Sequence, residues 1–162
     1  MKDLSRSVNV FAAASTIRSP GAAVRLFPAA VLDGPDERMM LVLLDEEGHF
    51  LAREWIAAGT GLALVYNAGL IARRIAVTGA AWFLLIHNHP GGNPALSETD
   101  AEGVRRVLLR PPPLLFRFLD FLAVAPPAKP EASPQFASFR FGPAGEGMGF
   151  VRAPFYSAET DV

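Results

Sequence analysis

One segment, residues 80–100, constrains the fold of this chain more than any other part of the sequence. It begins with seven apolar residues, continues with His87-Asn88-His89, and then passes through a turn rich in proline and glycine. The apolar run predicts a buried strand, and the turn residues predict where that strand ends. The segment finishes with Ser97-Glu98-Thr99-Asp100, a pattern that typically begins a helix. We therefore expect a strand, a tight turn and a helix, with two histidines at the end of the strand.

The two histidines of this segment are spaced so that they can act together. Successive side chains of a strand point to opposite faces, so His87 and His89 share one face and Asn88 points to the other. Asp100 falls in the first turn of the predicted helix, and the turn can fold its carboxylate back toward the histidines. Two imidazoles and one carboxylate can hold three corners of a tetrahedral zinc ion and leave the fourth corner for water. The segment therefore predicts a metal site of the kind that hydrolases use.

A simpler interpretation exists for each half of this pattern. Ser97-Glu98-Thr99-Asp100 also fits an acidic capping box, in which Asp100 reaches back to the backbone of Ser97. A His-x-His pair taken alone is more often a surface or packed pair than a metal site. The two signals at this spacing, joined by a rigid turn, favour the metal site. The two interpretations are compatible, because Ser97 can cap the helix while its hydroxyl faces the metal.

Composition narrows the choice of ligands and partners. The chain has no cysteine, which excludes disulfides and cysteine zinc sites and leaves His, Asp and Glu as the strong ligands. The third histidine, His49, follows a Glu-Gly turn and is expected on the surface of a hairpin. The formal net charge of -1 gives no overall attraction for nucleic acid, although Arg73-Arg74 and Arg105-Arg106 are local exceptions. Without a targeting signal or an apolar run near the ~20 residues that span a bilayer, we expect a cytoplasmic protein with no membrane partner.

Turn residues and periodicity divide the chain into three parts. Residues 1–16 are expected to be a flexible leader, 17–141 a single domain, and 142–162 a C-terminal tail in which Phe150 and Phe155 can dock. The domain mixes strands and helices, which predicts an α/β fold with a mixed sheet flanked by helices. The expected strands are Arg38–Leu44, Phe50–Ile56, Leu62–Tyr66, Ala81–Ile86, Phe118–Val124 and an edge strand over Ala137–Phe141. The expected helices begin at Pro20 with Ser19 as cap, cover Ala68–Thr78 between Asn67 and Gly79, and cover Glu98–Leu109.

The histidine segment resembles the JAMM (MPN+) metalloprotease signature. That signature is a glutamate, then His-x-His-Pro, six residues, Ser, two residues and Asp. Here Pro90 is followed by six residues, Ser97, two residues and Asp100. The wording His-Asn-His-Pro-x-Gly-x-Pro is similar to the RadC-like branch of that superfamily. The chain is therefore identified as a RadC-like JAB domain of the JAMM/MPN+ superfamily by resemblance.

The resemblance extends over roughly residues 17–125, with Phe139-Arg140-Phe141 as a further strand. Upstream, the chain is similar to the strand, turn and strand of the branch at Leu44-Asp45, Glu54 and Gly59-Thr60. Downstream, Phe118-Leu119-Asp120 resembles its "LLDH" strand, but Phe121 stands where that pattern usually has histidine. The resemblance implies a three-layer fold of the JAMM type, which is also called cytidine-deaminase-like.

The resemblance also assigns expected roles. It implies a zinc ion held by His87, His89 and Asp100. It implies that Glu37, just before the first core strand, is the general base and then the general acid, although the neighbouring Asp36 could be confused with it. It implies that Ser97 donates a hydrogen bond to the oxyanion of the tetrahedral intermediate.

The expected reaction is zinc-dependent hydrolysis of a peptide or isopeptide bond, with a peptide or a ubiquitin-like protein as substrate. Two other functions stay open at this stage. One is a non-catalytic protein-binding MPN module, which would show a broken site. The other is a DNA repair or recombination accessory, which would show salt-dependent DNA binding.

Overall fold

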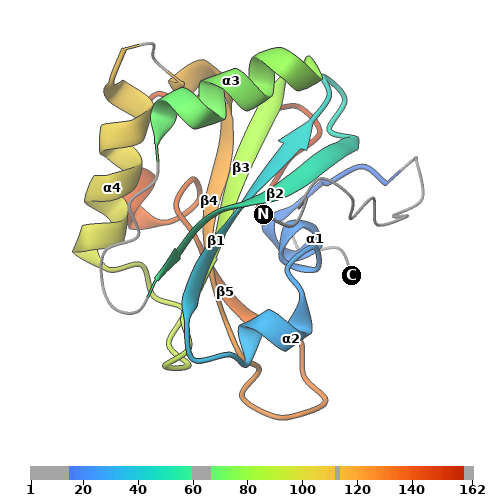
Figure 1. The fold of residues 1–162 in the computed structure, drawn as a ribbon, viewed down its shortest axis with the longest axis vertical. Helices are drawn as coiled ribbons and strands as arrows, with labels where there is room; N and C mark the ends of the chain where they lie inside the picture. The colour runs from blue at the N-terminus through green and yellow to red at the C-terminus, as the bar shows by residue number, and fades with distance from the viewer. Residues whose placement is uncertain (1–14, 60–66, 112–113, 159–162) are drawn as a thin grey trace, which may run out of the picture.

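The computed structural model describes residues 15–59, 67–111 and 114–158. They form one five-stranded sheet with helices on both faces (Figure 1). The strands are β1 (Glu37–Leu44), β2 (Phe50–Gly59), β3 (Trp82–Asn88), β4 (Phe118–Ala125) and β5 (Gln135–Ser138). The helices are α1 (Pro20–Val24), α2 (Ala29–Leu32), α3 (Ala68–Thr78) and α4 (Glu98–Leu109), with short 3-10 turns at Leu115–Arg117 and Pro143–Gly145.

The sheet is mixed, with the order β2-β1-β3-β4-β5. β1 pairs antiparallel with both β2 and β3, β3 pairs parallel with β4, and β4 pairs antiparallel with β5. α3 and α4 cover one face and α1 and α2 cover the other, which gives three layers. The predicted α/β fold, a mixed sheet flanked by helices, is confirmed, and it is consistent with a JAB/MPN-like fold.

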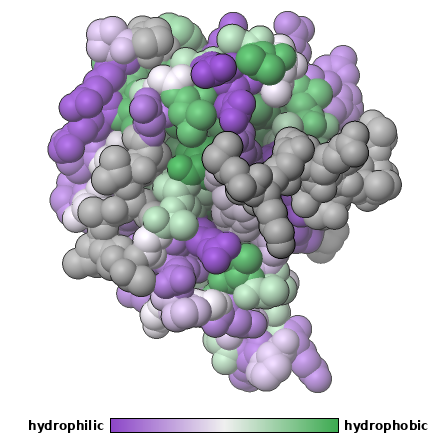
Figure 2. All heavy atoms as spheres, in the orientation of Figure 1, coloured by the Kyte–Doolittle hydropathy of each residue, from purple (hydrophilic) through white to green (hydrophobic). Residues whose placement is uncertain are grey.

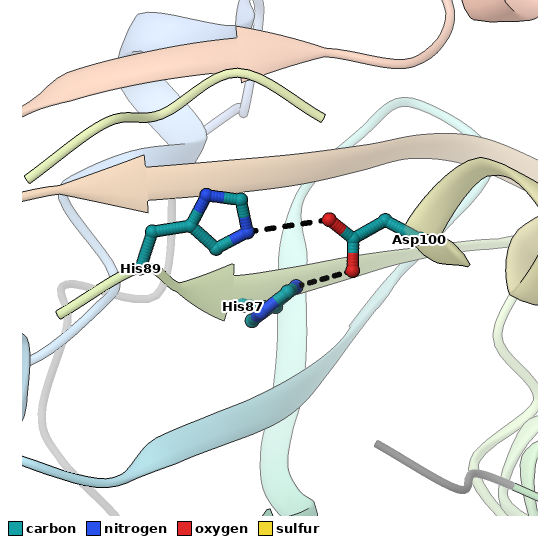
Figure 3. A group of neighbouring side chains, drawn as sticks. All are labelled: His87, His89 and Asp100. Carbon is teal, nitrogen blue, oxygen red and sulfur yellow. Dashed lines mark ion pairs between the residues drawn. The ribbon is translucent and has the colours of Figure 1, made fainter. Parts of the chain in front are cut away.

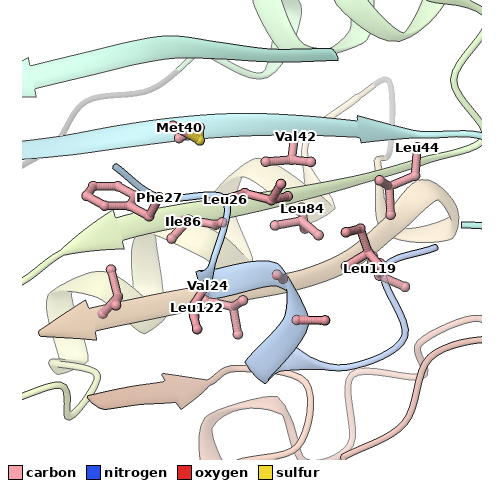
Figure 4. Close-up of a cluster of buried hydrophobic side chains, with 14 of the residues drawn as sticks. Val24, Leu26, Phe27, Met40, Val42, Leu44, Leu84, Ile86, Leu119 and Leu122 are labelled. Carbon is pink, nitrogen blue, oxygen red and sulfur yellow. The ribbon is translucent and has the colours of Figure 1, made fainter. Parts of the chain in front are cut away.

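Two separate hydrophobic cores show which way each strand residue faces. Met39 of β1 and Leu85 of β3 belong to the core under α3 and α4. Met40 and Ile86, one residue further on, belong to the core under α1 and α2, part of which Figure 4 shows. The alternation continues to the end of β3, so that His87 lies on the face covered by α3 and α4.

Local sequence signals explain where the helices start and stop. Ser19 caps α1, because its Oγ accepts the backbone N–H of Ala22 at 3.2 Å. Asn67 caps α3 in the same way, and Gly79 ends that helix with a φ of 69° that favours glycine. α4 covers Glu98–Leu109 as predicted. None of the helices in the described ranges has the length and apolarity needed to cross a membrane.

The last strand differs from its prediction. The sequence pattern predicts an edge strand over Ala137–Phe141, whereas β5 ends at Ser138. The backbone N–H of Arg140 donates to the buried Asp120 carboxylate at 3.0 Å and not to a backbone carbonyl of β4, so the strand pairing does not continue to Phe141. Phe139 then becomes fully buried in the core under α3 and α4. The predicted strand over Leu62–Tyr66 lies outside the described residues.

The segments that flank the domain also make contacts. Most of the predicted leader lies outside the described residues, but Thr16 forms an antiparallel bridge with His49. In the C-terminal segment, the ring of Phe150 packs 5.5 Å from that of Phe118, measured between centroids, and Phe155 packs 6.0 Å from Trp82. Figure 2 shows hydrophobic and hydrophilic side chains mixed at the end of the molecule where α3 runs, whereas the far end, which carries the proline-rich loop 126–134, is mostly hydrophilic.

Candidate metal centre

The end of β3 brings two imidazoles together on one face of the sheet. His87 is opposite Met39 in β1 and Ala123 in β4, and its side chain is only 2% exposed. His89 follows the end of β3, where its backbone N–H donates to the carbonyl of Val124 at 2.7 Å. The two rings are nearly perpendicular, with centroids 4.5 Å apart. The strand therefore presents both histidines to the same small volume, as their spacing predicts.

Asp100 reaches this volume from the first turn of α4. Its Oδ2 lies 3.3 Å from Nε2 of His89, and its Oδ1 lies 3.8 Å from Nδ1 of His87 (Figure 3). One ligand atom from each of the three side chains can be chosen so that all three atoms lie within 4.8 Å of one another. The three residues that the sequence groups as ligands thus form a cluster that could hold a metal ion.

The buried imidazole of His87 has unmet hydrogen-bonding capacity. Neither Nδ1 nor Nε2 has a hydrogen-bond partner. Burial lowers the pKa of His87 to about 4, so the ring is neutral at pH 7 and carries a free lone pair. An unpartnered polar group in the interior costs free energy unless something binds it. A metal ion beside Asp100 would meet this need, so the donor set fits a metal.

The backbone fixes the tautomer of His89. Its Nδ1–H donates to the carbonyl of Asn93 at 2.8 Å, which leaves Nε2 to face Asp100. Such a hydrogen bond to the far nitrogen is how proteins orient metal-binding imidazoles. The hydrogen bond with Asp100 raises the pKa of His89 in the absence of metal. Metal binding at Nε2 would therefore compete with protonation of that nitrogen.

The carboxylate of Asp100 is held ionised. Burial acts to raise its pKa, but hydrogen bonds from His89 and Ser97 outweigh this and lower the pKa to about 2. The Ser97 contribution is a complete capping box: Asp100 N–H donates to Ser97 Oγ, and Ser97 N–H donates to Asp100 Oδ2, each at 3.0 Å. The predicted capping box is confirmed. Ser97 is an exposed residue, and its hydroxyl both accepts the backbone N–H of Asp100 and acts on the Asp100 carboxylate, where its hydrogen bond helps to lower the pKa.

Glu37 lies at the edge of the same cluster. β1 and β3 are antiparallel with Met39 opposite His87, so Glu37, two residues earlier, shares the face of Met39 and lies on the His89 side. Burial raises the pKa of Glu37, and the charges of His89 and Asp100 also act on it. Asp36 precedes the strand, and its carbonyl accepts a hydrogen bond from Asn88. The register therefore favours Glu37 over Asp36 as the acid that faces the cluster.

With this geometry established, the chain can be compared with known proteins. The sequence profile of the RadC-like JAB domain matches residues 17–139. The chain belongs to the RadC-like JAB domain family.

This RadC-like JAB domain is similar to UPF0758 proteins of several bacteria. The chain is 34% identical over 92 residues to the UPF0758 protein of Trichormus variabilis (strain ATCC 29413 / PCC 7937), a match that covers 57% of this chain and 38% of that protein. It is 29% identical over 109 residues to the UPF0758 protein of Actinobacillus pleuropneumoniae serotype 5b (strain L20), with 67% and 49% covered. The chain thus spans less than half the length of these relatives.

Sequence reasoning missed two features around the candidate ligands of this RadC-like JAB domain. The carbonyl of Asn93 orients His89, and because a carbonyl is present in every residue, no side-chain signal marks it. Asn88 could have been found from the sequence, since a polar residue so close to a strongly apolar run is expected to be buried with hydrogen-bond partners. It does point away from the histidines, as predicted, and it is fully buried on the opposite face of β3.

Proposed function

We propose that this RadC-like JAB domain is a zinc-dependent hydrolase of peptide or isopeptide bonds. The observation that carries the proposal is the buried His87 ring, whose two nitrogens have no partner although an ionised carboxylate lies beside it. A neutral imidazole in this setting is prepared for a metal ion rather than for a proton. Within residues 15–59, 67–111 and 114–158, His87, His89 and Asp100 are the one group of at least three His, Asp or Glu side chains found close enough to share an ion.

The choice of zinc follows from the donor set. Imidazole nitrogen and carboxylate oxygen are ordinary zinc ligands, and three protein ligands leave a position for substrate or water, as catalytic zinc sites require. When bound, the metal would act as a Lewis acid toward a carbonyl or water oxygen. His87, His89 and Asp100 would hold it from β3 and α4.

Two further side chains would carry out proton transfer and charge stabilisation. Glu37 would accept the proton of the attacking water and return it to the leaving nitrogen. Burial raises the pKa of Glu37, and this direction favours a carboxylate that must take up a proton before it releases it again. The hydroxyl of Ser97 would donate a hydrogen bond to the oxygen of the substrate carbonyl as negative charge develops on it.

An extended protein segment is the proposed substrate. Among the residues that the structure describes, β2 is an edge strand of the sheet, and its last residue, Gly59, is paired with Glu37. Peptides often bind by adding a strand to such an edge, which would bring a scissile bond close to the cluster. The net charge of -1 gives no broad attraction for nucleic acid.

The test is hydrolysis by the zinc-loaded protein, with Glu37→Gln as the blank. Candidate substrates are ubiquitin-like fusion proteins, peptide libraries and DNA. We expect cleavage of an amide bond that depends on metal and disappears in Glu37→Gln. Cleavage of DNA alone would contradict the proposal. Tight DNA binding that is unchanged by substitutions at all five site residues, without cleavage of an amide bond, would also contradict it and favour a DNA accessory role.

A further inference from the structure

Asn88 binds both peptide groups that flank Glu37. Its Oδ1 accepts the backbone N–H of Arg38 at 2.7 Å, and its Nδ2 donates to the backbone carbonyl of Asp36 at 3.0 Å. Nδ2 also lies 3.4 Å from the carbonyl of Val31 in α2. The Asn88 side chain is 0% exposed. The orientation of its amide is fixed by these partners, since the reversed amide would set donor against donor and acceptor against acceptor.

These hydrogen bonds occur where the backbone ladder ends. The pairing between β1 and β3 stops at Met39 and His87, so it does not extend to Glu37. Beyond this point the chain after β3 bonds to β4 instead, through the N–H of His89. β2 pairs with Glu37 and Arg38 on one side, and on the β3 side the side chain of Asn88 takes the place of a strand neighbour. Asn88 is itself anchored, because it pairs with Val124 in the fully buried strand β4.

We infer that Asn88 is a positioning residue that holds Glu37 in place over the metal cluster. The inference rests on the proposed function, in which Glu37 is the general base. Three consecutive residues then have related roles. His87 and His89 present their rings on one face of the strand, and the Asn88 side chain on the other face holds the backbone of Glu37. The Asn88 side chain forms its hydrogen bonds with the backbone of residues 31, 36 and 38, so we expect it to act on Glu37 through that backbone.

Replacing Asn88 should separate the position of Glu37 from metal binding. Asn88→Ala removes every hydrogen bond of the side chain but leaves the three candidate ligands in place. We expect the zinc content to stay at the wild-type level and kcat to fall on the order of 10²-fold, with little change in KM, because small displacements of a reacting group have large effects on rate. Ser19→Ala is the matched control, since it also removes a buried polar side chain, the cap of α1, which lies on the opposite face of the sheet from His87.

A double-mutant cycle distinguishes positioning from general destabilisation. If Asn88 acts through Glu37, Asn88→Ala should cause no further loss of turnover in a Glu37→Gln background. An equal loss in both backgrounds would overturn the inference. Should Asn88→Ala fail to fold, Asn88→Asp keeps the acceptor for Arg38 but sets a second acceptor against the carbonyl of Asp36. Wild-type turnover by that variant at neutral pH would also overturn the inference.

Two measurements on the same variants need no activity. The Arg38 amide should lose protection against hydrogen exchange in Asn88→Ala, and in Co²⁺-loaded protein the paramagnetic shift of the Glu37 side chain should change. Retained protection together with an unchanged shift would overturn the inference. If wild-type protein hydrolyses no substrate, the proposed function fails, whereas these two measurements still decide whether Asn88 places Glu37.

Discussion

Ser97 and Asp100 cap each other, with hydrogen bonds of 3.0 Å in both directions between the backbone of one and the side chain of the other. The same carboxylate lies 3.3 Å from Nε2 of His89 and 3.8 Å from Nδ1 of His87. The capping box and the candidate metal site therefore share the side chain of Asp100. The hydrogen bond from the Ser97 N–H holds the Asp100 carboxylate at the start of α4, and in this position both carboxylate oxygens still face the histidines.

Replacing Ser97 should affect both stability and rate. Ser97→Ala removes a helix cap, which typically costs about 0.5–2 kcal/mol of the free energy of unfolding. If its hydroxyl also donates to the oxyanion, turnover should fall by about 10²–10³-fold. Urea unfolding and steady-state kinetics on the same preparation measure the two effects.

Asn67→Ala is the matched control for this substitution, because it removes the cap of α3. That variant should lose stability and keep its turnover. A Ser97→Ala protein that loses stability but keeps full activity would show that Ser97 is only a cap.

Replacing Glu37 should separate proton transfer from metal binding. Glu37→Gln keeps the size of the side chain and all three candidate ligands, so zinc content and melting temperature should stay near wild type. Turnover should fall by about 10²–10⁴-fold, the usual contribution of general acid–base catalysis. Loss of zinc from this variant would instead make Glu37 a ligand, and full activity would point to another acid as the base.

Asp120 should make stability depend on pH. This buried carboxylate accepts hydrogen bonds from the backbone N–H groups of Phe121 and Arg140 and from the hydroxyls of Ser138 and Tyr156. Burial nevertheless raises its pKa from 3.8 to about 6. A carboxyl group with a raised pKa in the folded state contributes stability that is present below the unfolded pKa and is lost as pH rises through the folded pKa.

The free energy of unfolding of wild type should therefore fall, relative to that of Asp120→Asn, as pH rises from about 4 to about 6. The size should be on the order of 3 kcal/mol, since each pKa unit corresponds to about 1.4 kcal/mol. Asparagine suits the site because the two hydroxyls can reverse and accept from its amide. If the free energies of unfolding of the two proteins differed by the same amount at every pH in this range, the prediction would be contradicted.

Much of the cluster could be predicted because the positions of its side chains depend on residues that are close in the sequence. The strand period places His87 and His89 on one face, and helix-start chemistry places Asp100 in the first turn of α4. The ends of α4 and the caps of α1 and α3 also follow from residues within a few positions. At these places the sequence pattern and the structure agree closely.

The features that sequence reasoning missed depend on distant partners. Asn88 binds the backbone at residues 31, 36 and 38, about fifty positions earlier in the chain, and backbone groups leave no mark in the sequence. β5 ends early because Asp120, on a neighbouring strand, captures the N–H of Arg140. The roles of Glu37 and Ser97 in catalysis stay predictions, since position alone does not measure a rate.

Metal content tests the central claim most directly. Purified wild-type protein, reconstituted with zinc and dialysed, should hold about one zinc per chain by elemental analysis, whereas the His87→Ala/His89→Ala double variant should hold almost none. A His49→Ala variant is the control, because His49 pairs with Asp45 in the β1–β2 turn, and it should keep its zinc. Zinc retained at the wild-type level by the double variant would contradict the assignment of this cluster as the metal centre.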